Sequence, residues 1–80
     1  MDRIKVEFGK GKENTFEREY DRSDKESAKQ MIFDYFEFFK KYRSTHTISA
    51  RTWKYPVVYI NNEPKAKVSP NGLWDEYKEN

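Results

Sequence analysis

Residues 23–43 read SDKESAKQMIFDYFEFFKKYR and predict a long helix that begins near residue 24 and ends near residue 43. Ser23 and Glu26 have the spacing of a capping box, in which two side chains satisfy backbone N–H groups at the start of a helix. At about 100° per residue, the apolar residues of this segment fall on one broad face. We expect that face to contact the core, and it comprises Ala28, Met31, Ile32, Tyr35, Phe38, Phe39 and Tyr42.

The segment before the helix has the pattern of a β-hairpin. Residues 3–8 alternate between apolar and polar side chains, residues 9–12 contain two glycines, and residues 15–20 alternate again. Arg18 is the one charged residue on the inward side of the second strand, so we expect its side chain to reach an edge of the core.

The segment after the helix predicts a second hairpin. Residues 55–60 are the most β-prone stretch of the chain, and their consecutive apolar side chains predict a central strand. Asn61 and Asn62 favour a tight turn. Residues 65–68 then form a return strand, which Pro64 places at the edge of the sheet because proline donates no ladder hydrogen bond.

Residues 69–72, SPNG, interrupt the strand pattern, and residues 73–77 are expected to form a short terminal helix. Ser69 would cap this helix, with Pro70 in its first turn. The resulting prediction is an α+β fold of the order ββαββ(α), in which a mainly antiparallel four-stranded sheet packs on one long helix. We expect residues 1–80 to form a single domain.

The composition restricts the class of function. A net charge of +2 is too small for a protein that coats nucleic acid through bulk electrostatics, and cysteine is absent, which excludes disulfides and thiol catalysis. No apolar run is long enough to predict a membrane span or a signal peptide, so we expect a cytoplasmic location. The excess of Lys, Asn, Tyr, Phe and Ile over Gly, Ala and Pro favours an AT-rich source, such as a low-GC bacterium, its phages or its mobile elements.

The stretch YPVVYINN at residues 55–62, with residues 65–68 and a helix at 73–77 after it, resembles the C-terminal half of glutaredoxin-like domains. The resemblance covers roughly a quarter of the chain. It implies a cis peptide bond before Pro56, beside a substrate site, and a final helix after the hairpin. Because the chain has no cysteine and residues 9–12 replace the first helix of that family, the resemblance implies a scaffold without redox activity.

Three pairs of side chains are candidates for catalysis: His46 with Ser44, Glu63 with Lys65, and Asp34 with Glu37. A single histidine in a polar segment is more often solvated than part of a hydrolytic triad. Pro64 disrupts the nuclease-like Glu-x-Lys motif, and a solvated helix face accounts for the third pair. The carboxylates between residues 17 and 26 are explained by a strand face and a helix N-terminus. We therefore predict no enzymatic activity, no metal site and no cofactor.

Residues 38–62 contain no acidic side chain, although acidic and basic residues alternate elsewhere, and this basic-aromatic window is the strongest functional signal. On the helix, basic and phenyl side chains spaced four, three, four and three residues apart form one stripe, whose C-terminal end lies within the window. The stripe consists of Lys29, Phe33, Phe36, Lys40 and Arg43. The predicted partner-binding residues are Lys29, Phe33, Phe36, Lys40, Arg43, Arg51, Trp53 and Lys54. The alternative for Phe33 and Phe36 is that both pack under the sheet or against Trp74 and Tyr77.

Two functions fit these observations. The first is a small protein-binding inhibitor or regulator from a phage or mobile element, which occupies a surface of nucleic-acid-handling machinery as anti-CRISPR proteins do. The second is a nucleic-acid-binding module in which the lysines and arginines of window 38–62 contact phosphates and Trp53 or Tyr55 stacks on bases. The sequence favours the first, because net +2 is low for a dedicated nucleic-acid binder and no recognition motif is present. Oligomeric state cannot be read from the sequence.

Overall fold

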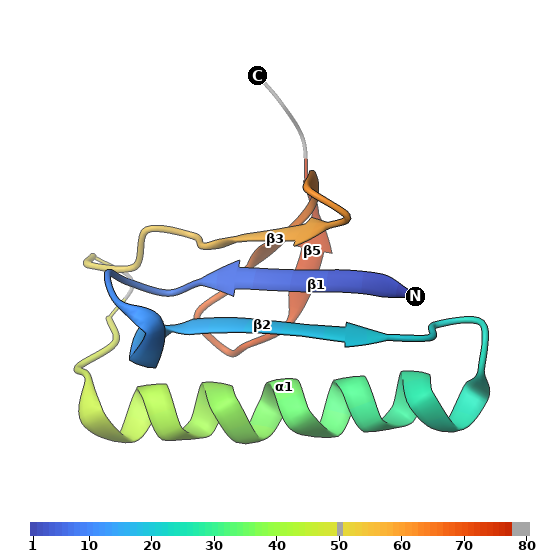
Figure 1. Ribbon diagram of the computed structural model, residues 1–80. Coiled ribbons are helices and arrows are strands. Elements are labelled where there is room, and N and C mark those ends of the chain that lie inside the picture. Colours follow the sequence, from blue (N-terminus) through green and yellow to red (C-terminus); the bar gives the residue numbers. More distant parts are fainter. Residues whose placement is uncertain (50, 78–80) are drawn as a thin grey trace.

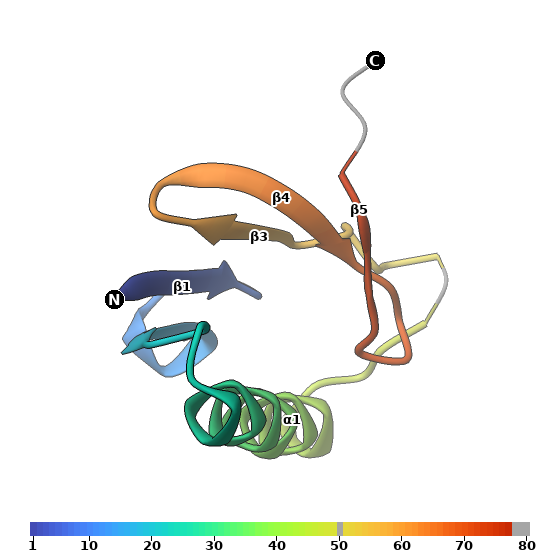
Figure 2. The ribbon, with the colours of Figure 1, turned by 90° about the vertical axis from the view of Figure 1, so that its right-hand side faces the viewer.

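The computed structural model describes residues 1–49 and 51–77, and over these ranges one antiparallel sheet of five strands packs on one long helix (Figures 1 and 2). The α+β class predicted from the sequence is confirmed. The elements in chain order are β1 (Asp2–Glu7), the short 3-10 turn η1 (Lys12–Asn14), β2 (Thr15–Tyr20), α1 (Lys25–Thr45), β3 (Val57–Ile60), β4 (Glu63–Val68) and β5 (Trp74–Glu76).

The strands lie in the order β2-β1-β3-β4-β5, and each neighbouring pair is antiparallel. The predicted N-terminal hairpin and the central position of β3 are confirmed, since β3 lies between β1 and β4. Two predictions are wrong: the sheet has five strands within the described residues instead of four, and β4 is covered by β5 instead of forming the edge. Figure 2 shows the sheet curling around one side of α1, and no described helix or strand covers the opposite face of the sheet.

The predicted terminal helix at residues 73–77 is wrong, because this segment contains strand β5. The Ser69 N–H donates to the Leu73 carbonyl at 2.9 Å, and the Gly72 N–H donates to the Ser69 carbonyl at 2.8 Å. Gly72 has a φ of 87°, which glycine adopts without steric cost. Residues 69–73 therefore reverse the chain, and the pairing of Val68 with Trp74 turns the indole under the sheet.

Helix α1 begins one residue later than a Ser23 capping box requires. The Asp24 side chain accepts a hydrogen bond from the Ser27 N–H at 3.1 Å and is the actual N-cap, whereas the Ser23 hydroxyl binds Asp21. The buried helix residues are Met31, Tyr35 and Phe39. This spacing of four defines a narrower core face than the predicted one, because the sheet covers the helix from one side only.

The core is a continuous cluster of aliphatic and aromatic side chains between the sheet and α1. Phe16 on β2 is its largest fully buried member, and it packs edge-on against Tyr35 with ring centroids 5.8 Å apart. Arg18, beside it on β2, lies exposed at the margin with its guanidinium 3.5 Å from Asp34, as the hairpin pattern predicts. The Tyr20 hydroxyl donates to the same carboxylate at 2.8 Å, which ties β2 to the helix.

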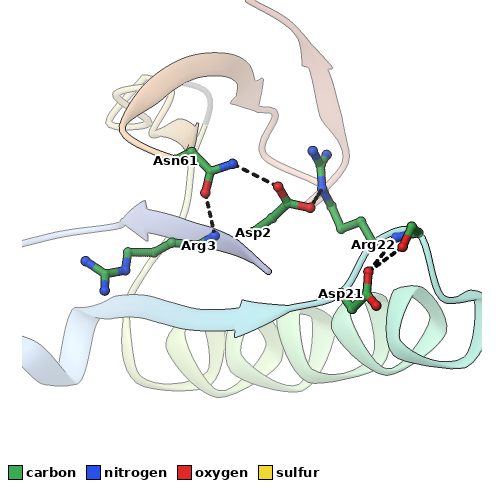
Figure 3. Close-up of polar contacts among 6 residues, drawn as sticks. Asp2, Arg3, Asp21, Arg22 and Asn61 are labelled. Atoms are coloured by element: carbon green, nitrogen blue, oxygen red, sulfur yellow. Dashed lines mark hydrogen bonds and ion pairs between the residues drawn. The ribbon is translucent and has the colours of Figure 1, made fainter.

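A polar network joins the β3–β4 turn to the N-terminus (Figure 3). Asn61 and Asn62 have φ of 52° and 68°, as a two-residue hairpin turn requires, and the predicted tight turn is confirmed. The Asn61 amide oxygen accepts from the Arg3 backbone N–H at 2.9 Å, and its nitrogen donates to Asp2 at 2.8 Å. The hydrogen bond from Arg22 to the Asp2 carboxylate, followed by that from Asn61, holds the Asp2 pKa below its usual value.

The segment that resembles glutaredoxin-like domains differs from that family in two details. No peptide bond between described residues is cis, so the bond before Pro56 is trans. The chain after the hairpin continues into a strand, not into a helix.

Candidate protein-binding surface

An apolar groove of about 280 Å³ lies between α1 and the segment that leads into β5. It lies at the β5 edge of the sheet, where the turn before β5 approaches α1, whereas β2 packs against α1 at the other edge (Figure 2). Its lining contains almost no polar surface and comprises Met31, Ile32, Tyr35, Phe36, Gly72, Leu73 and Trp74.

Tyr35 and Trp74 form the floor of the apolar groove. Their rings meet edge to face with centroids 5.1 Å apart, and Tyr35 is 2% exposed. The Tyr35 hydroxyl and the Trp74 indole nitrogen are both buried without a hydrogen bond to any described residue. Burial raises the pKa of the Tyr35 phenol to about 12, and the neighbouring indole N–H offsets only part of that rise.

We expect Tyr35→Phe to stabilise the protein by about 1 kcal/mol at neutral pH, because a buried hydroxyl without a partner costs on the order of 1–3 kcal/mol. The native protein should also lose roughly 2 kcal/mol between about pH 10 and 12, where the unfolded phenol releases its proton and the folded one keeps it. The variant should lack that loss. Urea unfolding at pH 7 and pH 11 measures both effects.

Tyr59→Phe serves as the control for this experiment, because it removes one hydroxyl from the uncovered face of the sheet. A Tyr35→Phe protein that is less stable than the native protein at pH 7 would show that the hydroxyl makes a stabilising interaction.

Exposed apolar side chains line the apolar groove at Ile32 and Leu73, and Phe33 follows Ile32 on α1 outside the lining. Ile32 is 52% exposed, Phe33 61% and Leu73 53%, and Phe36 is half-buried between them and the core. The two phenylalanines therefore differ: Phe33 is open to solvent, whereas Phe36 packs on Tyr35 and lines the groove. We call Ile32, Phe33, Phe36 and Leu73 the apolar surface.

The predicted basic residues of the helix flank this surface, but two of them carry acidic partners. The Lys29 ammonium lies 3.8 Å from Glu26, and the Lys40 ammonium lies 3.1 Å from Glu37. Arg43 makes no ion pair with a described residue. Exposed pairs of this kind contribute little to stability, and they neutralise much of the stripe's charge. The stripe is thus more apolar than basic.

The remaining predicted residues lie at the other end of the helix. Arg51 and Lys54 are exposed in the connection between α1 and β3. Trp53 is half-buried against Phe39, and its indole N–H donates to the Val68 carbonyl at 2.7 Å. These contacts hold the connection on the core, so the Trp53 ring is engaged within the fold.

Lys54 is part of a second, open groove, which lies beside the β1–β2 hairpin. Lys10 and Lys12 contribute to it, and no ion pair with a described residue neutralises these three lysines. The same groove contains Glu7 and Glu17, so its charge is mixed.

Two of the candidate catalytic pairs are held by other partners: Glu37 pairs with Lys40, and His46 and Ser44 contact the end of α1. Glu63 and Lys65 instead form an exposed ion pair at 3.1 Å. The His46 ring stacks on Tyr42 with centroids 4.1 Å apart, and the Ser44 hydroxyl donates to the Lys41 carbonyl. Among residues 1–49 and 51–77, no group of three metal-ligating side chains comes together. No helix within the described residues is both long and apolar enough to cross a membrane.

Phe33 and Phe36 were predicted as site residues, whereas the prediction that Ile32 contacts the core was wrong and the exposure of Leu73 was not predicted. The apolar side chains at 32, 33 and 36 exceed what one core face can bury, and this excess was the available signal for Ile32. The sequence contains no signal for the exposure of Leu73, because that exposure depends on where the turn at residues 69–72 places β5.

Comparison of the chain with protein-family models, with curated proteins and with solved structures found no match, so the surface is interpreted from its own chemistry.

Proposed function

We propose that this protein is a non-enzymatic binding module that acts by covering a surface of a partner protein. Its apolar surface supplies the anchors, and the charged side chains of α1 form the rim. The amino-acid composition, which favours an AT-rich source genome, supports a regulator or inhibitor from a phage or mobile element. We propose that it acts on nucleic-acid-handling machinery of its host.

The observation that carries this proposal is the exposure of Ile32 and Leu73 in the lining of one apolar groove, with the exposed Phe33 next to Ile32 on α1. Ile32, Phe33 and Leu73 are each more than half exposed, although a small core of eleven buried residues would gain from burying them. Contiguous exposed apolar side chains with a polar rim are typical of protein interaction sites. Aromatic anchors of this kind supply much of the affinity of such interfaces.

The test is quantitative capture from the lysate of a low-GC bacterium, with the native protein and a Phe33→Asp variant as baits. We expect a specific host protein to be retained by the native bait and reduced at least tenfold by the variant, since removal of an interface anchor costs about 2 kcal/mol or more. Mass spectrometry with isotope labelling measures the ratio.

Tyr55→Asp is the matched control, because Tyr55 is 52% exposed and lies in the connection before β3, away from the apolar surface. Retention that falls for Tyr55→Asp and not for Phe33→Asp would contradict the proposal. The nucleic-acid alternative is tested in parallel by anisotropy with single-stranded DNA at two salt concentrations. Salt-sensitive binding that is lost in a Lys10→Ala, Lys12→Ala and Lys54→Ala triple variant would favour it instead.

A further inference from the structure

The side of α1 that faces the apolar groove carries basic and apolar side chains and no acid. Phe36 lines the groove, and successive residues of a helix project at steps of about 100°. The acidic side chains of the helix are Glu26, Asp34 and Glu37, and each projects at least about 80° away from Phe36. We call the side chains that project within roughly 40° of Phe36 the groove flank. It comprises Lys25, Lys29, Ile32, Phe36, Lys40 and Arg43.

The groove flank is apolar in the middle and basic at both ends. Ile32 and Phe36 line the groove, and two of the four cations precede them on the helix while the other two follow. At about 1.5 Å per residue, the flank extends along roughly 27 Å of the helix. All four cations are exposed, and Lys25 and Arg43 make no ion pair with a described residue. Each end of the flank therefore keeps an unneutralised positive charge.

The other wall of the groove adds apolar surface without charge. It consists of Gly72, Leu73 and Trp74, and the turn before it, residues 69–72, contains no charged residue. Glu76 shares a face of β5 with Trp74, but β5 leads away from α1 after the turn (Figure 2). A ligand that matches both walls is thus apolar in its centre and acidic at its ends.

An amphipathic helix has the shape that this surface requires. Ile32 and Phe36 lie four residues apart and form a ridge, and such ridges pack between the side chains of a second helix. Both helices rise by the same distance per residue, so acids at the two ends of the second helix meet both basic ends of the flank. An extended segment gains no ladder hydrogen bonds from α1, because the backbone groups of a helix interior bond within the helix.

A second copy of this chain and a lipid surface both fit less well. Antiparallel packing of two groove flanks would bring Lys29 of one copy close to Lys40 of the other, and parallel packing would bring identical basic ends together, so both arrangements repel. A flat anionic bilayer that reached Phe33 would also meet Glu26 and Glu37, because both project within about 40° of Phe33. The surface therefore favours a helix of another protein.

We propose that the groove flank accepts an amphipathic helix of the partner protein, whose apolar side chains enter the apolar groove and whose two ends carry acidic side chains. This inference rests on the proposed function, because it specifies which kind of segment the apolar surface binds. It also assigns a role to the cations at both ends of α1.

The probe is a capped alanine-based peptide of about 18 residues, a length that supports a helix, with leucines at steps of three and four in its centre and a pair of glutamates at each end. Leu73 is the chain's only leucine, so ¹³C-methyl labelling of leucine in the protein reports on one residue in the groove wall. We expect the Leu73 methyl signals to shift on titration with the peptide. Unchanged Leu73 signals at about 1 mM peptide overturn the inference.

Two altered peptides test the charge and the helix. A peptide with lysines in place of the glutamates should bind at least tenfold more weakly. A peptide with prolines in place of two central alanines keeps its leucines and glutamates but cannot form the helix, so it should also bind at least tenfold more weakly. Equal affinity of the lysine peptide overturns the charge assignment, and equal affinity of the proline peptide overturns the helical form of the partner.

Arg43→Glu and Lys41→Glu are a matched pair of charge reversals, since both residues are exposed near the end of α1 and only Arg43 lies in the groove flank. At low ionic strength, we expect Arg43→Glu to weaken binding of the glutamate peptide at least threefold and to strengthen binding of the lysine peptide. Lys41→Glu should have a smaller effect on both affinities. Equal effects of the two reversals would mean that the peptide responds to net charge and not to the groove flank, which overturns the inference.

The outcomes for the two proposals are distinguishable. If Phe33→Asp reduces capture of the host protein while the glutamate peptide does not bind, the protein-binding surface stands and the helical partner fails. If capture is unaffected by Phe33→Asp, the proposed function itself fails. Binding to vesicles of phosphatidylglycerol and phosphatidylcholine, without binding of the peptide, would assign the surface to a lipid membrane instead.

Discussion

Phe16→Ala is expected to destabilise the protein by about 3–5 kcal/mol, the cost of removing a buried phenyl ring from a packed core. Phe16 is 1% exposed and contacts Tyr35 and Phe38 edge-on, so its loss opens a cavity between β2 and α1. A chain of 80 residues has a total stability of roughly 4–12 kcal/mol. The variant should therefore lose a large share of its free energy of unfolding, as measured by urea titration with circular dichroism against the native protein.

Phe33→Ala is the matched control for this substitution, since it removes the same side chain from an exposed site on α1. We expect its free energy of unfolding to change by no more than about 0.5 kcal/mol. Equal losses for the two variants would mean that Phe33 is buried or that Phe16 is not, and either result would contradict the described packing.

The elements that the sequence predicted are those with a strong local signal. The helix, the N-terminal hairpin and β3 follow from periodic apolar residues, and Asn61 and Asn62 fix their own turn because asparagine tolerates positive φ. The helix cap was misplaced by one residue, since Ser23 and Asp24 are both good N-caps and the choice depends on the approach of the chain.

The C-terminal segment was mispredicted because its local signals are ambiguous. Ser69 followed by Pro70 fits the start of a helix as well as a reverse turn. Contacts that are distant in the sequence decide between them: Trp74 packs on Tyr35, and β4 offers a free edge with which β5 can pair. Strand β5 has only three residues, which is too short to show a periodic pattern of apolar side chains. A single sequence therefore does not reveal that this segment pairs with β4.

The same distant contacts create most of the candidate site. Phe33 and Phe36 were predicted from their place on the helix, whereas the apolar groove arises where the sheet ends beside α1. Charge was the less reliable signal, since Lys29 and Lys40 have acidic neighbours one turn away on the same helix. The acid-free window proved to be several separate environments in the structure, with Trp53 held on the core.

Gly72 affects both the stability of the fold and the shape of the groove. Its φ of 87° lies in the region that disfavours a side chain, and a Cβ built there would be 2.8 Å from two carbons of the Phe39 ring. Phe39 is buried in the core beneath the groove, so it cannot move away freely. The close approach of the Gly72 backbone to this ring is what brings β5 next to α1.

We expect Gly72→Ala to cost about 2–4 kcal/mol, of which roughly 1–2 kcal/mol is backbone strain at positive φ and the rest is the clash with Phe39. A double-mutant cycle with Phe39→Leu separates the two parts, because a smaller and more flexible side chain leaves room for the new methyl group. In that background the cost of Gly72→Ala should fall by at least 1 kcal/mol, as measured by urea unfolding. Additive losses would mean that the methyl group does not meet Phe39, and that the backbone conformation of Gly72 alone, without close packing on the ring, positions β5 beside the groove.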